Sequence, residues 1–241
     1  RTQTAADATR PTATLTGGIP PGGARQITIS DTGGRSNYRA MTLQLNKDRG
    51  ADRYGLRFAY TLSKLENDTD DINFRASDSN DFAADRGPSA NDREHVISAV
   101  AFFYPVQGLT LTVAGLFQSG QPINYVPDAA TFGTQDLNGD GQSFGENFVG
   151  NSDRYPGVAR NAGRLPWSKS IDLGIRYDWP VSEQAIELSA DVFNVFDWNN
   201  LSGFANAATT SNQIQFGGGA PFVQRNAGPP RQFQLGIAWK F

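Results

Sequence analysis

Three oxygen-bearing side chains, Asp136, Asn138 and Asp140, occupy alternate positions of one short segment that also contains two glycines. This is the pattern of the first half of a calcium loop, in which alternate oxygens face a hard cation and a glycine permits the bend. Position twelve, where a bidentate Glu belongs, is Asn147, and Glu146 stands one residue early. Asp, Asn and Gly also form plain turns. Bound calcium and a solvated turn both remain open, and no other cofactor is expected.

His95 is the only histidine, so a Ser-His-Asp triad would depend on it. It follows Asp92, Arg93 and Glu94 at the start of a predicted strand, and no Gly-x-Ser-x-Gly elbow accompanies it. We therefore expect a residue at the rim of the fold and no enzymatic activity, with a hydrolase that depends on His95 as the alternative. Carboxylates for glycosidase chemistry also occur in one acidic run, which we expect to be solvated loop charge: Glu66, Asp68, Asp70 and Asp71.

A third group of charged residues recurs at every second position of predicted strands. If these strands cross a membrane, an Arg that faces lipid at mid-depth costs about 2 to 4 kcal/mol, so the charged side chains should face away from lipid, toward the lumen of a barrel. They could pair across neighbouring strands, contact a plug or contact a ligand. The predicted lumen-facing set is Arg53, Arg57, Asp172, Arg176, Asp178, Glu187 and Asp191.

These residues are positioned by segments in which apolar and polar side chains alternate, the period of a β-strand. In the last of them Phe233, Leu235, Ile237, Trp239 and Phe241 share one face. Ten residues at about 3.3 Å each, tilted near 45°, rise about 23 Å, close to the apolar band of an outer-membrane barrel. Seven strands are predicted, at roughly 37–47, 53–63, 93–104, 109–118, 170–179, 186–196 and 232–241, and only 93–104 is apolar on both faces, so its faces stay unassigned.

The connections alternate between tight turns and long loops. Turns at 48–52, 105–108 and 180–184 are short, whereas 65–92, 121–166 and 198–230 are long. Outer-membrane barrels have short periplasmic turns and long external loops, and they carry girdles of aromatic residues at both interfaces. We therefore predict an all-β, antiparallel transmembrane β-barrel over 37–241, preceded by a loop and partial-strand region over 1–36. A self-contained porin or adhesin barrel and a soluble β-sandwich binding module are the alternatives. Aromatics lie at or near the short-turn ends: Tyr54, Tyr104, Trp179, Trp239 and Phe241.

Composition narrows the function further. The 241 residues carry a net charge of −3, so nucleic-acid binding has no electrostatic support. No apolar run is long enough for a transmembrane helix, and the absence of cysteine removes thiolate catalysis and cysteine-metal sites. Seven strands cannot close a single-chain bacterial barrel, where counts are even, and the run at 26–30 is too short to span. We expect the C-terminal portion of a larger barrel.

Several motifs follow one another along the chain, among them Asp92-Arg93-Glu94-His95-Val96, Gly157-Val158-Ala159-Arg160-Asn161 and Asp191-Val192-Phe193-Asn194-Val195-Phe196-Asp197. Together and in this order, they resemble the C-terminal barrel portion of TonB-dependent outer-membrane receptors of the Oar-like group. The spacing of Gln234, Gly236, Trp239 and Phe241 resembles the C-terminal signal that the barrel-assembly machinery recognises.

The resemblance implies a 22-stranded barrel with an N-terminal plug in the outer membrane of a Gram-negative bacterium. Such a receptor sits in outer-membrane lipid and takes up a bulky ligand (siderophore, cobalamin, oligosaccharide or peptide) with energy from the TonB complex. Neither plug nor TonB box is found in this sequence, so we expect its share to be barrel wall and external loops.

Overall fold

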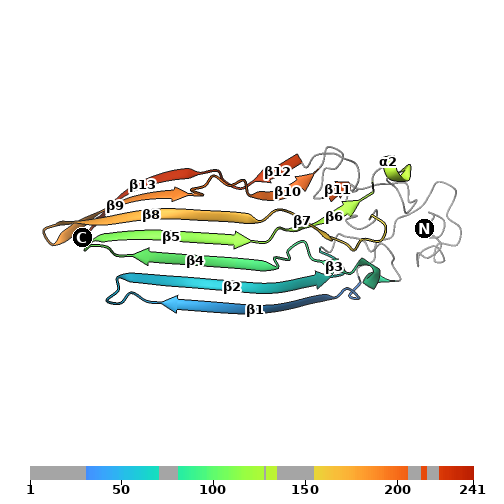
Figure 1. The fold of residues 1–241 in the computed structure, drawn as a ribbon, viewed down its shortest axis with the longest axis horizontal. Helices are drawn as coiled ribbons and strands as arrows, with labels where there is room; N and C mark the ends of the chain where they lie inside the picture. The colour runs from blue at the N-terminus through green and yellow to red at the C-terminus, as the bar shows by residue number, and fades with distance from the viewer. Residues whose placement is uncertain (1–30, 71–80, 128, 135–154, 206–212, 216–222) are drawn as a thin grey trace.

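The computed structural model describes residues 31–70, 81–127, 129–134, 155–205, 213–215 and 223–241. Seven long strands lie side by side in one antiparallel layer (Figure 1), and each predicted strand is confirmed. In spatial order they are β1 (Ser36–Lys47), β2 (Tyr54–Asn67), β4 (His95–Phe103), β5 (Leu109–Gln118), β8 (Ser168–Val181), β9 (Gln184–Phe193) and β13 (Gln232–Lys240).

The strands stay in a register that keeps one face of the sheet apolar from edge to edge. Residues directly opposite each other in an antiparallel pair share a face. Ile175 on β8 is opposite Ala190 on β9, which in turn is opposite Leu235 on β13. The same rule resolves β4, because His95 is opposite Leu62 on the apolar face. The odd positions of β4 therefore belong to the apolar face, and its even positions to the polar face.

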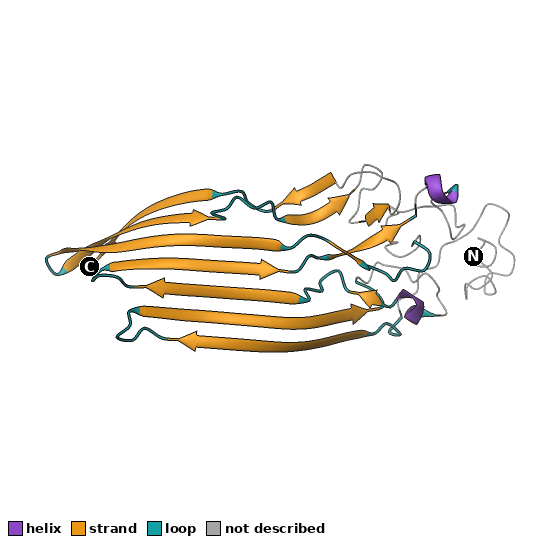
Figure 2. Ribbon diagram, viewed as in Figure 1, coloured by secondary structure: helices purple, strands orange, loops and turns teal. Residues whose placement is uncertain are grey.

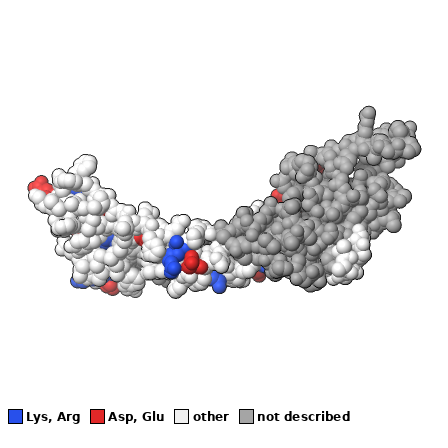
Figure 3. Space-filling model, turned by 90° about the horizontal axis from the view of Figure 1, so that it is seen from above, with Lys and Arg blue, Asp and Glu red and all other residues white. Residues whose placement is uncertain are grey.

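The apolar face is not covered by any second layer within the described residues. Leu235 and Ile237 are 83% and 77% exposed, and the buried apolar core of the described residues consists of Ile123 and Leu165 alone. White, uncharged surface predominates over the described part of the molecule in Figure 3. A soluble sandwich would bury its apolar face between two sheets, so this alternative is wrong.

The two ends of the sheet differ. At the turn end, strands are joined by 48–53, 104–108 and 182–183, and the C-terminus lies there as well (Figure 1). At the opposite, loop end, the long connections contain short elements, whereas the sequence had predicted plain loops (Figure 2). The strand β2 also runs to Asn67, past the predicted start of the first loop.

The short elements of the loop end lie at or beyond the ends of the long strands (Figure 1). They are the 3₁₀-helix η2 (Phe82–Asp85), β3 (Gly87–Pro88), β6 (Pro122–Val126), the single-turn helix α2 (Ala129–Phe132), β7 (Gly163–Arg164), β10 (Leu201–Ala205), β11 (Gln213–Gln215) and β12 (Val223–Ala227). β3 extends the main sheet by pairing with β2, while β6 pairs with β7 and β11, and β10 pairs with β12. Among the described residues, no helix has the length and apolar character needed to cross a membrane.

Candidate functional site

The predicted calcium ligands Asp136, Asn138 and Asp140 lie outside the described residues. Within the described ranges, no group of three or more His, Cys, Asp or Glu side chains could hold a metal ion. The calcium loop therefore stays a prediction from the sequence.

His95 lies at the loop end of the apolar face, where its imidazole contacts two aromatic side chains. Its Nδ1 is 2.9 Å from the hydroxyl of Tyr60, and its ring stacks on Trp167 with centroids 5.7 Å apart. Asp92, the acid that opens the sequence motif, instead accepts the backbone N–H of Leu65 at 2.7 Å. A phenol and an indole thus surround the imidazole, where a triad would need a carboxylate and a nucleophile.

The predicted lumen-facing charges lie mostly on the polar face, as their registers show. Lys240 Nζ lies 2.7 Å from the carboxylates of both Asp178 and Glu187 and so bridges two acids that oppose each other across β8 and β9. Arg176 lies 3.9 Å from Asp191. Two like charges directly opposite each other destabilise a sheet, and Lys240 compensates the two negative charges of Asp178 and Glu187.

The remaining members of that set are placed differently from one another. Arg57 pairs with Asp48 of the first turn, and Asp172 accepts the backbone N–H of Asn194 at 2.8 Å. Arg53 precedes β2 with φ +59° and donates to the carbonyl of Pro105 at 2.8 Å. Arg53 therefore lies just before the strand and not within it, and its side chain ties two turns together.

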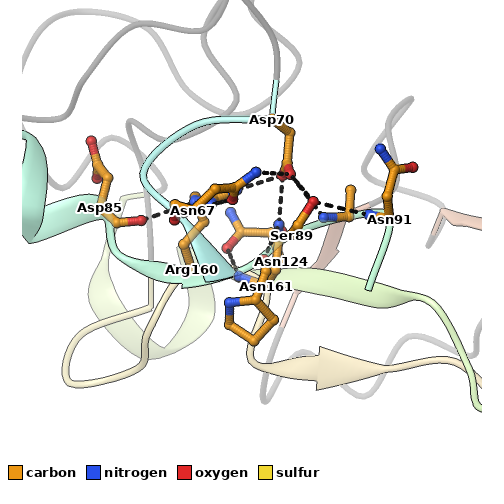
Figure 4. Close-up of polar contacts among 10 residues, drawn as sticks. Asn67, Asp70, Asp85, Ser89, Asn91, Asn124, Arg160 and Asn161 are labelled. Carbon is orange, nitrogen blue, oxygen red and sulfur yellow. Dashed lines mark hydrogen bonds and ion pairs between the residues drawn. The ribbon is translucent and has the colours of Figure 1, made fainter. Parts of the chain in front are cut away.

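The most developed polar site of the described structure is centred on Arg160. This side chain is 1% exposed, although an arginine is almost never fully buried without partners. Its Nε donates to the backbone carbonyl of Asp85 at 2.9 Å, one terminal nitrogen pairs with the carboxylate of Asp70, and the other donates to the carbonyl of Asn67 at 2.7 Å and to the Asn67 side chain. Figure 4 shows these groups gathered around the guanidinium. One cation thus holds the end of β2, the following bend and η2 together.

The carboxylate of Asp70 is satisfied from several sides. It accepts bonds from the hydroxyl of Ser89 at 2.8 Å, the backbone N–H of Ala90 at 2.9 Å and the amides of Asn67 and Asn161 at 3.0 and 2.8 Å. Burial raises the pKa of this carboxyl, but the hydrogen bonds together with the charge of Arg160 outweigh burial and hold the pKa below its ordinary value. The group is therefore ionised at neutral pH.

Asn161 brings a third chain segment to the same place. It adopts φ +54°, a left-handed conformation that Asn tolerates better than most residues. Its side-chain amide donates to the carbonyl of Pro88 at 3.0 Å, and its backbone N–H donates to the side chain of Asn124 on β6 at 3.2 Å. We call Asn67, Asp70, Arg160 and Asn161 the latch, because they join residues 67–70, 85–90, 122–126 and 155–165.

The latch depends on a close approach of backbones. A Cβ at Gly87 would lie 2.2 Å from the carbonyl oxygen of Arg160, a distance that only glycine permits. A second ion pair, between Arg164 and Asp92, fixes the same loop to the start of β4. Burial and the nearby charge of Arg164 lower the pKa of Arg93, which lies beside this pair.

Two hollows lie on the polar side of the sheet. One, of about 380 Å³, is lined by polar-face residues that include Gln44, Arg57 and Asp172. The other, of about 240 Å³, lies nearer the loop end and is lined by Tyr38 and Arg93, among others. The linings of both hollows combine these polar groups with small and apolar side chains.

Sequence reasoning missed the latch. The acidic run was predicted to be solvated, yet Asp68 is 7% exposed and the Asp70 side chain 9% exposed, so this prediction is wrong for both residues. The segment that contains Arg160 and Asn161 entered only as part of a family resemblance. An arginine next to asparagine in a loop, with an acidic run upstream, was the only available signal.

A comparison with protein-family models matches residues 1–234 to the outer membrane beta barrel domain. The chain belongs to this family. The exposed apolar face and the antiparallel register agree with an outer-membrane location, and the sheet does not close into a complete barrel within the described residues. A search of curated proteins found no match.

Proposed function

We propose that this chain forms part of the wall and the external loops of a TonB-dependent outer-membrane receptor that takes up a bulky ligand. The observation that carries the proposal is the latch, which gives two long connections at one end of the wall a fixed arrangement. Binding residues lie disproportionately on loops that a rigid scaffold positions, and a receptor needs loops of defined shape to recognise its ligand.

The proposal includes an orientation. The turn end faces the periplasm and the loop end faces outward, as is usual for outer-membrane barrels. The polar face lines the lumen, because its charges would be costly in lipid and both hollows lie on that side. In the described part of the chain β1 and β13 are the edges of the sheet, and such edges cannot face hydrocarbon with unpaired backbone groups, so further strands complete the wall.

Orientation can be tested cleanly because the chain contains no cysteine. A cysteine at Ala129, in the exposed helix α2, should react on intact cells with a membrane-impermeant maleimide. A cysteine at Glu183, between β8 and β9, should react only after the outer membrane is permeabilised. The reverse pattern would overturn the orientation.

Transport is tested with radiolabelled members of the four ligand classes in the native host. We expect uptake of one class to be lost both in a strain without this protein and in a strain without TonB. Uptake that persists without TonB would indicate a passive porin, and unchanged uptake of every class in the strain without this protein would refute a transport role.

A further inference from the structure

Charged side chains on the apolar face of the described sheet occur only at its two ends. At the loop end these are Arg39 on β1, Lys64 and Glu66 on β2, and Lys169 on β8, as their registers show. At the turn end Lys47 lies over the ring of Tyr54. The residues between the two ends are apolar or small, so the loop-end cations stand directly beside the part of the face that contacts lipid.

These cations are poorly compensated. Arg39 lies directly opposite Lys64, an arrangement that repulsion makes unfavourable. Lys64 pairs with Glu66 at 2.8 Å in an exposed ion pair. Within the described ranges, the side chains of Arg39 and Lys169 have no carboxylate partner. Three cations against one carboxylate leave an excess of two positive charges at this margin.

A stack of three rings lies between these cations and marks the depth at which they sit. Tyr60 and His95 stack at 6.1 Å between centroids with planes 10° apart, and His95 and Trp167 follow at 5.7 Å and 13°. Amphipathic aromatic rings are typical of the boundary between hydrocarbon and headgroups. The indole of Trp167 is 41% exposed, so part of this ring is open to a neighbouring molecule. The adjacent cations therefore lie at headgroup level.

We propose that this rim, made of Arg39, Lys64, Lys169 and the exposed ring of Trp167, binds a phosphorylated glycolipid of the outer leaflet. Arginine and lysine recognise phosphate by charge-assisted hydrogen bonds, and an exposed indole offers a flat apolar surface to a sugar ring. From β1 to β8 the rim crosses four interstrand spacings, about 19 Å in all. This width suits a headgroup with more than one phosphate.

Two features of the rim identify its ligand as a phosphorylated glycolipid. The rim is positively charged and so complements phosphate, and it continues the lipid-facing surface. The inference rests on the proposed orientation, since only then does the rim lie in the outer leaflet. Binding to the purified protein does not depend on orientation in the cell, so this test and the maleimide labelling can fail separately.

The experiment uses the protein purified from outer membranes and placed in phosphatidylcholine nanodiscs that contain bisphosphorylated lipid A. Native mass spectrometry counts the bound glycolipid, and Trp fluorescence reports on the rim. We compare the protein with the triple variant Arg39→Gln, Lys64→Gln, Lys169→Gln. The matched control is Lys47→Gln, which removes a cation from the same face at the turn end.

One basic residue near an anionic surface contributes about fivefold in affinity, so the triple variant should lose well over tenfold. Lys47→Gln should bind like the unmodified protein, and dephosphorylated lipid A should bind as weakly to the unmodified protein as lipid A does to the triple variant. Trp167→Phe should abolish the change in fluorescence that lipid A causes.

Three results would overturn the inference. The first is equal affinity of the triple variant and the unmodified protein, with both shown to be folded by heat-modifiability gels. The second is equal binding of phosphatidylglycerol, which would indicate attraction to any anionic surface. The third is displacement of lipid A by millimolar inorganic phosphate, which would indicate a site for free anions.

Discussion

Replacing Arg160 by alanine should release the loop end of the wall without unfolding the sheet. The substitution removes four hydrogen bonds and leaves the buried carboxylate of Asp70 without its cation. Breaking a buried ion pair from one side costs about 3 to 5 kcal/mol. Because the latch touches the wall only at Asn67, the last residue of β2, this cost falls on local opening of residues 155–165.

Hydrogen exchange measures that opening directly. The backbone N–H of Leu165 donates to Gln121 at 2.9 Å, that of Tyr155 to Tyr125 at 3.1 Å, and that of Ser89 to Leu65 at 2.9 Å. A loss of 3 kcal/mol corresponds to more than 100-fold faster exchange, since about 1.4 kcal/mol is a factor of ten. Amides in the middle of β8 should keep their protection.

A matched control separates burial from charge. Arg57 also pairs with an aspartate, Asp48, but the two side chains are 51% and 87% exposed. Exposed pairs contribute about 0 to 1 kcal/mol, so Arg57→Ala should leave exchange at the loop end unchanged. Unchanged protection of Tyr155 and Leu165 in Arg160→Ala would refute the latch. Equal effects of the two variants would show that burial does not set the cost.

Four further outcomes are expected. The pKa of Asp70 is lowered in the folded state, so its stabilisation is full above the unfolded value of about 3.9 and is lost as pH falls through the folded value; proteolysis of the loop end should rise below about pH 4 while the wall resists. Ile175→Arg, in the middle of the lipid-facing side of β8, should destabilise the folded barrel by about 2 to 4 kcal/mol in urea titrations in lipid vesicles. Gly87→Ala should accelerate exchange at the latch, whereas Gly34→Ala, whose Cβ would meet its nearest atom at 3.9 Å, should not. Phe241→Ala should lower the assembled amount in heat-modifiability gels more than the stability of the folded protein, and unchanged levels would count against an assembly signal.

Local periodicity made the strands predictable. An apolar side chain at every second position identifies a strand whatever its neighbours are, and all seven long strands were found this way. The faces of β4 could not be assigned, because Val96, Val100 and Phe102 place apolar side chains on its polar face as well. The register of β4 against β2 and β5 assigns its two faces. This register depends on how the strands pair, which the sequence of β4 alone does not show.

The latch was unpredictable for a different reason. Arg160 and Asp70 are 90 positions apart, and nothing local to either residue shows that the other will be its partner. An acidic run in a polar loop is ordinarily solvated, so the general rule gave the wrong answer at Asp70. Which charges of a loop become buried depends on how two long connections fold against each other. No period in the sequence encodes this packing.

The chemistry of the latch indicates why it is polar. Replacing a buried ion pair by packed apolar side chains is often neutral or stabilising, so stability alone does not account for Arg160. Its planar guanidinium, however, holds the carbonyl of Asn67, the carboxylate of Asp70 and the carbonyl of Asp85 in directions fixed by its own geometry. Apolar contacts tolerate sliding, whereas these bonds specify one arrangement of the end of β2, η2 and the 155–165 segment. A wall whose loops have to present one surface to a ligand gains from that restriction, which is why we propose a receptor.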